Sequence, residues 1–464
     1  MTEFSSPIGR PAKAAVALVA TLVMLAAAPQ TSAETLEEAL ARAYETNPTL
    51  LARRAQLRAT DEGVAVAMSG WRPSVTLSGD VSRQQSYNNT RSSPTSRYTT
   101  PYGGELQIRQ PLFNFSTSPS ISRAENQVRA ERAALKSAEQ QVLQSVINAY
   151  VDVLRYQAIL DLNVNNEQRL RRQYDATNDR FRVGEVTRTD VSQAQARVAR
   201  ATADRVLAEG NVAAARAVYR NVVGVPPVDL VPPAALRDLP ANGEEATIMA
   251  AAQNPDVQTA EFTELAARDN IRAIEGELLP EFNLTGTLSA DEHATNGDSH
   301  ANAATITADV TVPLYTAGSV AARIRAAKQT AEQRRNQLDE ARRDSMETAT
   351  RSWELLKTAQ ASLRALVSEI EASQIALEGV EKEALVGSRT VLDVLDAEQE
   401  LLNARVRQVV ARRDEVAASY QVKASVGGLT ARELGIPVQL YDEERNYRNN
   451  SGRWWGNSIE GERQ

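Results

Sequence analysis

Apolar and polar residues alternate in four short stretches of this 464-residue chain. Alternation with a period of two predicts strands with one apolar face, and runs of about 9–11 residues match tilted membrane-spanning strands. The first two strands are expected before and after a polar loop at 82–102, and the last two before and after a polar loop around 293–300. The apolar positions are Val75, Leu77, Gly79 and Val81; Leu106 and Ile108; Phe282, Leu284, Gly286 and Leu288; and Ile306, Ala308, Val310 and Val312.

Between these stretches the pattern becomes helical over long distances. Residues 118–183 contain no glycine, no proline after Pro119, and an apolar residue at every seventh position from Ile121. A heptad repeat predicts a coiled-coil seam, and at about 1.5 Å per residue this helix would be roughly 100 Å long. We expect the chain to turn at Gly184 and return over 187–223. Residues 318–386 and 390–427 predict a second helical pair.

The two sets of elements repeat one another. Asn47-Pro48 recurs as Asn254-Pro255, and Gly184, Thr187 and Asp190 recur at the same spacing as Gly387, Thr390 and Asp393. Asn before Pro is a strong start for a helix, and the glycines are suited to ending one. We therefore expect an internal duplication. Its parts would be a first unit (34–223), a Pro-rich link (224–243), a second unit (244–428) and a C-terminal equatorial or tail segment (429–464) that is loosely ordered after Gly435.

Residues 1–33 predict a secretory signal peptide. Arg10 and Lys13 precede an apolar run at 14–28, and small residues at 31–33 suit cleavage. The alternative, an uncleaved membrane anchor, needs a longer apolar run than this one. No later stretch is apolar enough for a membrane helix, so any membrane crossing must be by strands.

Composition narrows the chemistry further. The chain has no cysteine, so disulfides, thiolate nucleophiles and a lipid on an N-terminal cysteine are excluded. Its net charge of −7 does not indicate nucleic acid binding. There is no glycine-rich phosphate loop and no nucleophile beside a base, and both histidines, His293 and His300, fall in a polar loop. The sequence therefore predicts no enzyme activity, no cofactor and no metal site.

Four strands are too few for a spanning barrel, because the smallest barrels have about eight, and open edges leave unpaired backbone groups in lipid. We therefore expect the chain to oligomerise, with each copy donating a short sheet. Aromatic residues where strands meet helices would form a girdle against outer membrane lipid: Trp71, Phe113, Phe115, Phe282 and Tyr315.

Over essentially the whole mature sequence, the chain resembles the TolC-type outer membrane efflux and secretion channels, and most of all their TolC/BepC-like branch. The motifs are the duplicated Asn-Pro, Gln110-Pro111-Leu112-Phe113 with its partner at 312–315, and the string Val386–Asp396. One departure is Asn114-Phe115-Ser116-Thr117, where the family usually has a glycine-rich turn. The resemblance implies a mainly α fold with membrane β-strands. A homotrimer would form a twelve-stranded β-barrel continued by an α-helical coiled-coil barrel in the periplasm.

The resemblance also implies a function and partners. The trimer would be the passive exit duct of a multidrug efflux or type I secretion system. A periplasmic adaptor protein and an inner-membrane pump or secretion ATPase would complete the conduit. The helical turns at Gly184, Thr187, Gly387 and Thr390 would receive the adaptor. The competing class is a periplasmic coiled-coil adaptor or scaffold, but the four bilayer-length strands favour the channel.

A gate at the helical tips is implied in the same way. Asp393 and Asp396 match aspartates that line the periplasmic constriction of the family. Arg389 matches an arginine that latches the closed tips, with partners matching Thr189 and Asp190, while a tyrosine of that latch is Ala384 here.

Local structure offers a simpler explanation for two of these aspartates. Thr187 with Asp190, and Thr390 with Asp393, both fit a helix capping box. Asp396 lies one turn further along the same face as Asp393, and capping does not require it.

Overall fold

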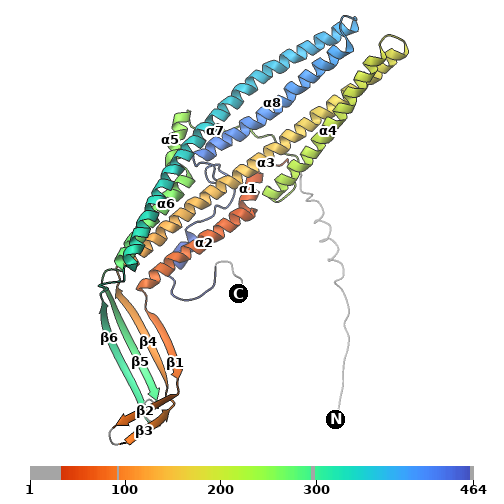
Figure 1. Ribbon diagram of the computed structural model, residues 1–464. Helices are drawn as coiled ribbons and strands as arrows, with labels where there is room; N and C mark the ends of the chain where they lie inside the picture. The colour runs from red at the N-terminus through yellow and green to blue at the C-terminus, as the bar shows by residue number, and fades with distance from the viewer. Residues whose placement is uncertain (1–32, 91–92, 294–297, 460–464) are drawn as a thin grey trace, which may run out of the picture.

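The computed structural model describes residues 33–459 except 91–92 and 294–297, so the predicted signal peptide lies outside the described residues apart from its last position. The molecule is elongated, with a long helical part and a narrow sheet that leaves it at one end (Figure 1). The helices are α1 (Leu36–Thr46), α2 (Pro48–Met68), the short 3-10 helix η1 (Ser69–Trp71), α3 (Thr117–Arg182), α4 (Arg188–Val223), α5 (Gly243–Gln253), α6 (Pro255–Gly276), α7 (Ser319–Leu385), α8 (Val391–Ser425) and α9 (Arg445–Asn450).

Four strands form one antiparallel sheet in the order β1-β4-β5-β6, where β1 is Ser74–Val81, β4 is Tyr102–Phe113, β5 is Glu281–Glu292 and β6 is His300–Thr311. These are the four strands that the alternation predicts. Their register aligns the apolar positions in rows on one face: Val75, Ile108, Gly286 and Ile306 form one row, and Leu77, Leu106, Leu288 and Ala304 the next. A row on the opposite face is polar: Thr76, Gln107, Thr287 and Thr305.

The prediction of a polar loop at 82–102 is wrong. This segment forms β2 (Gln84–Thr90) and β3 (Ser93–Thr99), an antiparallel ribbon that extends the far end of the sheet (Figure 1). Backbone hydrogen bonds hold the ribbon together. With no apolar side to bury, its strands produce no alternation in the sequence. His300 is also expected in a loop, but it begins β6 and pairs with Glu292. The polar residues at this end of the strand likewise produce no apolar alternation.

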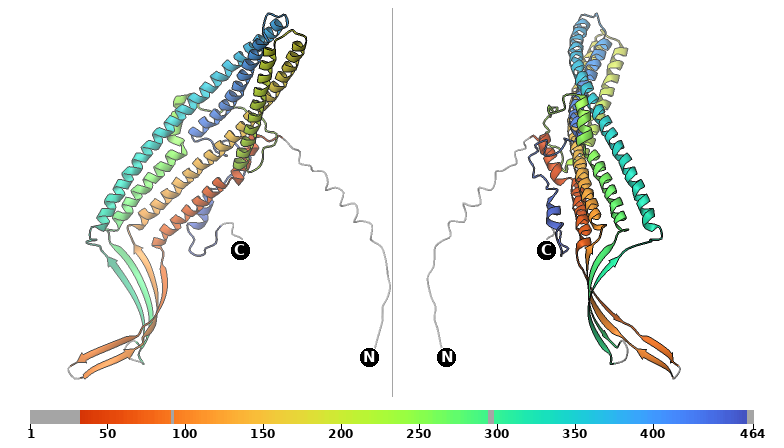
Figure 2. Two further views of the ribbon diagram at one scale, coloured as in Figure 1. Left: turned by 45° about the vertical axis from the view of Figure 1, so that its right-hand side comes forward. Right: turned by 90° about the vertical axis from the view of Figure 1, so that its left-hand side faces the viewer.

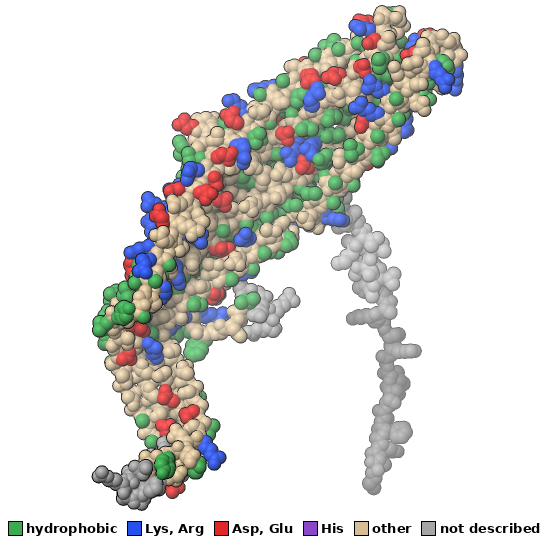
Figure 3. All heavy atoms as spheres, viewed as in Figure 1, with side chains coloured by type: hydrophobic (Ala, Val, Ile, Leu, Met, Phe, Trp, Pro, Cys, Tyr) green, Lys and Arg blue, Asp and Glu red, His purple; other side chains and the backbone are tan. Residues whose placement is uncertain are grey.

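The long helices form two antiparallel hairpins, α3 with α4 and α7 with α8 (Figure 1). The predicted heptad seam of α3 is confirmed from Val128 to Ala149, where every seventh residue is buried, whereas Ile121 and Tyr156 at its two ends are partly exposed. Helices α2, α3, α6 and α7 pack side by side in a single layer, which Figure 2 (right) shows nearly edge-on. Among the described helices, none combines the length and apolarity needed to cross a membrane. On the face shown in Figure 3, charged side chains of both signs cover the helices, whereas the sheet carries few.

The largest hydrophobic core lies midway along the helical part, where α1, α2, α3, α4, α8 and residues 429–436 meet. Tyr150 and Tyr219 are fully buried there, with ring centroids 6.3 Å apart. The Tyr150 hydroxyl lies 2.7 Å from the carbonyl oxygens of both Glu34 and Val231. It thereby ties the start of the described chain and the Pro-rich segment to α3.

The two halves of the chain share one order of elements and one repeated contact. Asn47 caps α2 by accepting from the Thr49 N–H at 3.0 Å, and its amide donates to the Val222 carbonyl at 3.0 Å. Asn254 caps α6 in the same way through Asp256 at 2.8 Å, and donates to the Ser425 carbonyl at 3.1 Å. The repeated geometry agrees with the predicted duplication, whose boundaries stay a prediction.

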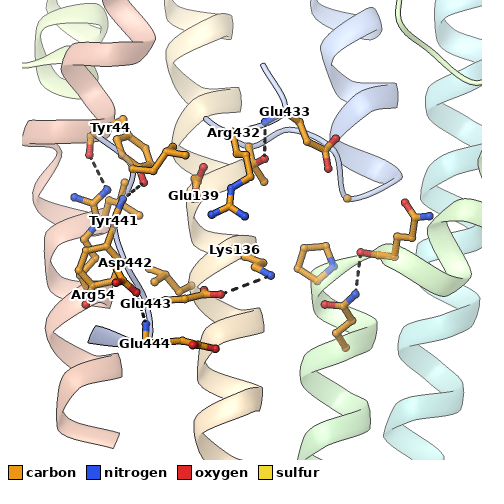
Figure 4. Close-up of a pocket in the computed structure, with 18 residues that line it drawn as sticks. Tyr44, Arg54, Lys136, Glu139, Arg432, Glu433, Tyr441, Asp442, Glu443 and Glu444 are labelled. Carbon is orange, nitrogen blue, oxygen red and sulfur yellow. Dashed lines mark hydrogen bonds and ion pairs between the residues drawn. The ribbon is translucent and has the colours of Figure 1, made fainter. Parts of the chain in front are cut away.

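The expectation that the chain is loosely ordered after Gly435 is wrong for the described residues. The Tyr441 N–H donates to the Tyr44 hydroxyl at 3.1 Å, and Arg54 stacks between these two rings (Figure 4). Further on, the Asn446 amide of α9 reaches Asp61 of α2 at 3.1 Å. The segment and the helices line a partly open pocket of about 660 Å³ (Figure 4). The sequence of this segment lacks a period because scattered contacts hold it in place: polar bonds together with single apolar side chains, such as Ile436 and Tyr447, that pack on the main core.

Candidate functional site

The two hairpins end in nearly identical turns, at the end of the molecule farthest from the sheet (Figure 1). Gly184 and Gly387 have φ of +81° and +79°, a conformation that favours glycine. After each glycine, an N–H closes the helix end: Glu185 to the Arg180 carbonyl at 2.9 Å, and Ser388 to the Glu383 carbonyl at 3.0 Å. This is the Schellman arrangement, so the predicted helix-ending role of both glycines is confirmed.

Both returning helices begin with the predicted capping box. Asp393 Oδ2 accepts from the Thr390 N–H at 2.9 Å and from its hydroxyl at 2.8 Å, and the Asp393 N–H donates back to Thr390 Oγ1 at 3.3 Å. Thr187 and Asp190 make the same set of bonds. These hydrogen bonds, helped by the charge of Arg389, lower the pKa of Asp393. Asp393 is therefore a fixed, ionised carboxylate.

Asp396 has a different partner, and it lies on the other hairpin. Arg197 of α4 donates from Nη2 to Asp396 Oδ1 at 2.6 Å. Most of the Arg197 side chain is buried, whereas Asp396 is exposed. Sequence reasoning missed Arg197, although a signal existed. In the second predicted unit, the residue that matches Arg197 is Glu400. The two units of the chain therefore carry opposite charges at this position.

Beneath this ion pair the hairpins share a small apolar contact, the hairpin seam, formed by Leu170, Ala201 and Leu395 with Val198 and Val391 around them. Glu398 is buried on α8, one turn from the seam residue Leu395. Burial raises the pKa of Glu398, the charge of Glu381 adds to the rise, and Arg169 opposes it.

Arg389 is exposed at the second tip, where its Nε donates to Glu383 Oε2 of the preceding helix at 2.9 Å. Within one protomer the structure does not bring Arg389 to Thr189 or Asp190. Thr189 is exposed at the first tip, and Asp190 is engaged in its own capping box. The latch therefore stays a prediction, one that needs contacts between copies.

The structure brings four of the five predicted girdle aromatics together at the junction of sheet and helices. The Trp71 and Phe113 rings lie 6.3 Å apart and the Phe113 and Phe115 rings 4.8 Å apart, both edge to face. Phe282 pairs with Phe113 across β4 and β5. Tyr315 is separate, because it follows β6 at the opposite edge of the sheet, and it is highly exposed.

Comparison with known proteins identifies the relatives of this architecture. The sequence profile described as "Outer membrane efflux protein" matches residues 20–225 and 248–428. The outer membrane efflux protein BepC of Brucella suis is 36% identical over 450 residues, which cover 96% of this chain and 97% of BepC. The outer membrane protein TolC of Vibrio cholerae is 28% identical over 87% of this chain and 92% of its own length.

Solved structures show the same fold. The CmeC outer membrane channel of Campylobacter jejuni superposes with a TM-score of 0.77 at 16% identity, covering 90% of this chain and 89% of CmeC. The profile match spans most of the chain in two blocks, and the relative at 36% identity spans nearly all of it. The chain belongs to the outer membrane efflux protein family.

Proposed function

We propose that three copies of this chain form a gated, passive exit duct for multidrug efflux or type I secretion. The observation that carries the proposal is the sheet. Its apolar rows are exposed on one face, where Leu77 and Ile306 retain 78% and 82% of their surface, and its other face is polar. Such a sheet suits lipid on one side and a water-filled lumen on the other.

The sheet also supports the trimer. In one protomer β1 and β6 are edge strands, and an open edge in lipid leaves backbone N–H and C=O groups without partners. Pairing β1 of one copy with β6 of the next satisfies both edges. Three sheets of four strands then give a twelve-stranded barrel, within the size range of outer membrane barrels.

The helical layer would continue this barrel as a periplasmic tube, with the hairpin tips at its far end. Asp393 and Asp396 from three copies would form a ring of six carboxylates, which attracts cations. Arg197 pairs with Asp396 and therefore offsets part of that charge. We place the gate at this ring, with Arg389 as the link between neighbouring copies.

The partners would be a periplasmic adaptor and an inner-membrane pump or secretion ATPase. The tips are suited to an adaptor because they expose apolar residues beside the turns, namely Val183, Leu385 and Val386. Exposed apolar side chains that lie close together are typical of protein interaction sites.

Reconstitution in planar bilayers tests the proposal. The purified protein should conduct in discrete steps, whereas an adaptor or scaffold would not conduct. Leu77→Asp with Ile306→Asp should abolish insertion, because it places charges on the lipid face. The matched control is Thr76→Asp with Thr305→Asp, which alters neighbouring positions on the polar face and should still conduct. Loss of conduction in both variants, or in neither, would contradict the assignment of faces.

A further inference from the structure

The last described segment forms a closed loop, here called the C-terminal loop (residues 451–459). The Arg453 side chain organises it by donating from Nε to the Trp455 carbonyl at 2.9 Å and from Nη1 to the Ser458 carbonyl at 3.0 Å. Its Nη2 reaches Ser458 Oγ at 3.0 Å. Gly456 makes the turn possible with φ of +99°. One guanidinium thus fixes the shape of the loop.

A second arginine attaches this loop to the junction of helix and sheet. Arg72 donates to the carbonyls of Arg453 at 2.7 Å and Ser451 at 3.1 Å, and its guanidinium lies 5.3 Å from the centre of a Trp454 ring. Arg72 stands between Trp71 of the predicted girdle and the start of β1. In all views the described chain that follows α9 lies near the level where the helices give way to the strands (Figures 1 and 2).

The loop presents two adjacent tryptophans to the outside. Trp454 and Trp455 retain 60% and 84% of their surface, although the loop around them is held by five hydrogen bonds from arginine side chains. Leaving a large aromatic ring in water is unfavourable, because its apolar surface stays hydrated. Indole rings have an apolar body and one N–H donor, and are enriched at the membrane–water interface.

We propose that the C-terminal loop is a membrane-surface anchor that seats Trp454 and Trp455 among the lipid headgroups on the periplasmic side of the outer membrane. The inference rests on the proposed function, because it requires the sheet to span the membrane at the level of Trp71. Arg72 joins the loop directly to that level.

A second copy of the chain is the other candidate occupant, and the geometry disfavours it. A neighbouring protomer would extend the layer of helices and strands at its edge. The C-terminal end instead stands off one face of that layer, together with α1 and α9 (Figure 2, right). At the level where helices give way to strands, lipid headgroups would surround the tube and would lie against the face from which this end projects.

The chain suits a fluorescence test because it has only four tryptophans, Trp71, Trp353, Trp454 and Trp455. Three variants are needed, each with phenylalanine in place of the remaining tryptophans. The first keeps only Trp454 and Trp455 (the loop pair), the second only Trp71 and the third only Trp353. Each is reconstituted into phosphatidylcholine liposomes with or without bromine on the acyl carbons nearest the headgroups. Planar-bilayer conductance verifies that each variant is assembled.

We expect brominated lipid to quench the loop pair about as strongly as Trp71, and to leave Trp353 of α7 unquenched. Quenching of Trp71 without quenching of the loop pair would overturn the anchor and leave the proposed channel intact. In that case, blue-shifted emission from the loop would identify a second copy as its cover, and red-shifted emission would place it in water. Unquenched Trp71 would overturn the membrane placement of the girdle, and the anchor with it.

Discussion

Arg197 on α4 and Asp396 on α8 form an ion pair of 2.6 Å that joins the two helical hairpins near their tips. Asp396 is one of the carboxylates assigned to the gate, so its charge is partly neutralised within the protomer. The other, Asp393, is held by its capping box and has no such cation from the opposite hairpin. Asp396 therefore has a neighbouring positive charge on the opposite hairpin, which Asp393 lacks. If the two hairpins moved apart, Asp396 would lose this positive neighbour.

The first prediction concerns cation block of the channel. Arg197→Gln should strengthen block by divalent or trivalent cations, and Asp396→Asn should weaken it. A unit charge about 6 Å from a divalent cation contributes roughly 1.4 kcal/mol in water, so removing Arg197 should lower the blocking concentration of a divalent cation about tenfold. Single-channel recordings measure this change. Arg200→Gln is the control, because Arg200 pairs with Asp204 of its own helix. An equal shift in both arginine variants would contradict a specific role for Arg197.

The second prediction separates a latch between copies from a local contact. Arg389→Ser should raise the conductance of the resting trimer if Arg389 links neighbouring tips. Glu383→Gln removes the partner that Arg389 has within its own turn, so it should leave the channel closed. Planar-bilayer conductance without partners is the measurement. Unaltered conductance in Arg389→Ser would remove this residue from the latch.

The fold could be predicted to a large extent because each element follows from a local rule. Alternation at Val75 and Ile306 indicates the strands, and the Thr390–Asp393 spacing gives the helix cap. The family match supports the outer membrane location and the periplasmic helices that these patterns imply. It also points to a channel family, in agreement with the prediction that the chain is not an enzyme.

Other features depend on contacts that no local rule encodes. The pairing of Arg197 with Asp396 depends on how two separate hairpins are oriented relative to each other. The docking of Asn446 on α2 depends on single polar bonds between distant segments, which leave no period in the sequence. The side chains described in the ribbon of β2 and β3 are nearly all exposed, so its strands lack the apolar alternation that identified the other four.

The third prediction concerns the turn that departs from the family pattern. Asn114 organises this turn by accepting from the N–H and hydroxyl of Ser116 at 2.9 Å and 2.6 Å. Gly276 of α6 packs against it so closely that a Cβ would lie 2.6 Å from the Ser116 nitrogen. Gly276→Ala should therefore destabilise the fold by about 1–3 kcal/mol, as overpacking does.

The control for this variant is Gly63→Ala. Gly63 is exposed within α2, and an added Cβ would meet nothing within 4 Å. Alanine there should stabilise the helix by about 0.5–1 kcal/mol. Thermal unfolding in detergent compares the two variants, and a Gly276→Ala protein as stable as the parent would contradict the close approach.

The fourth prediction concerns Glu398 near the hairpin seam. Burial raises its pKa above the ordinary value of 4.5, so the folded state holds the proton more tightly than the unfolded state. Stability should then fall as pH rises from about 4.5 through the folded-state pKa, because the buried group becomes charged. Glu398→Gln should raise the unfolding temperature at pH 7 and make little difference below pH 4.5. Glu400→Gln, at an exposed position on the same helix, should show no such pH-dependent gain.

The last prediction concerns the buried Tyr150 hydroxyl. Its loss in Tyr150→Phe should cost about 1–2 kcal/mol at neutral pH, because the Val231 carbonyl loses a close donor. Burial raises the pKa of Tyr150 from 10.0 to about 12. As pH rises from 10 towards 12, the unfolded state therefore loses this proton before the folded state does, and the parent protein loses stability that the phenylalanine variant keeps. Unfolding temperatures at pH 8 and pH 11.5 should show the gap closing. A constant gap, or an equal effect from Tyr87→Phe on the exposed ribbon, would contradict this role of Tyr150.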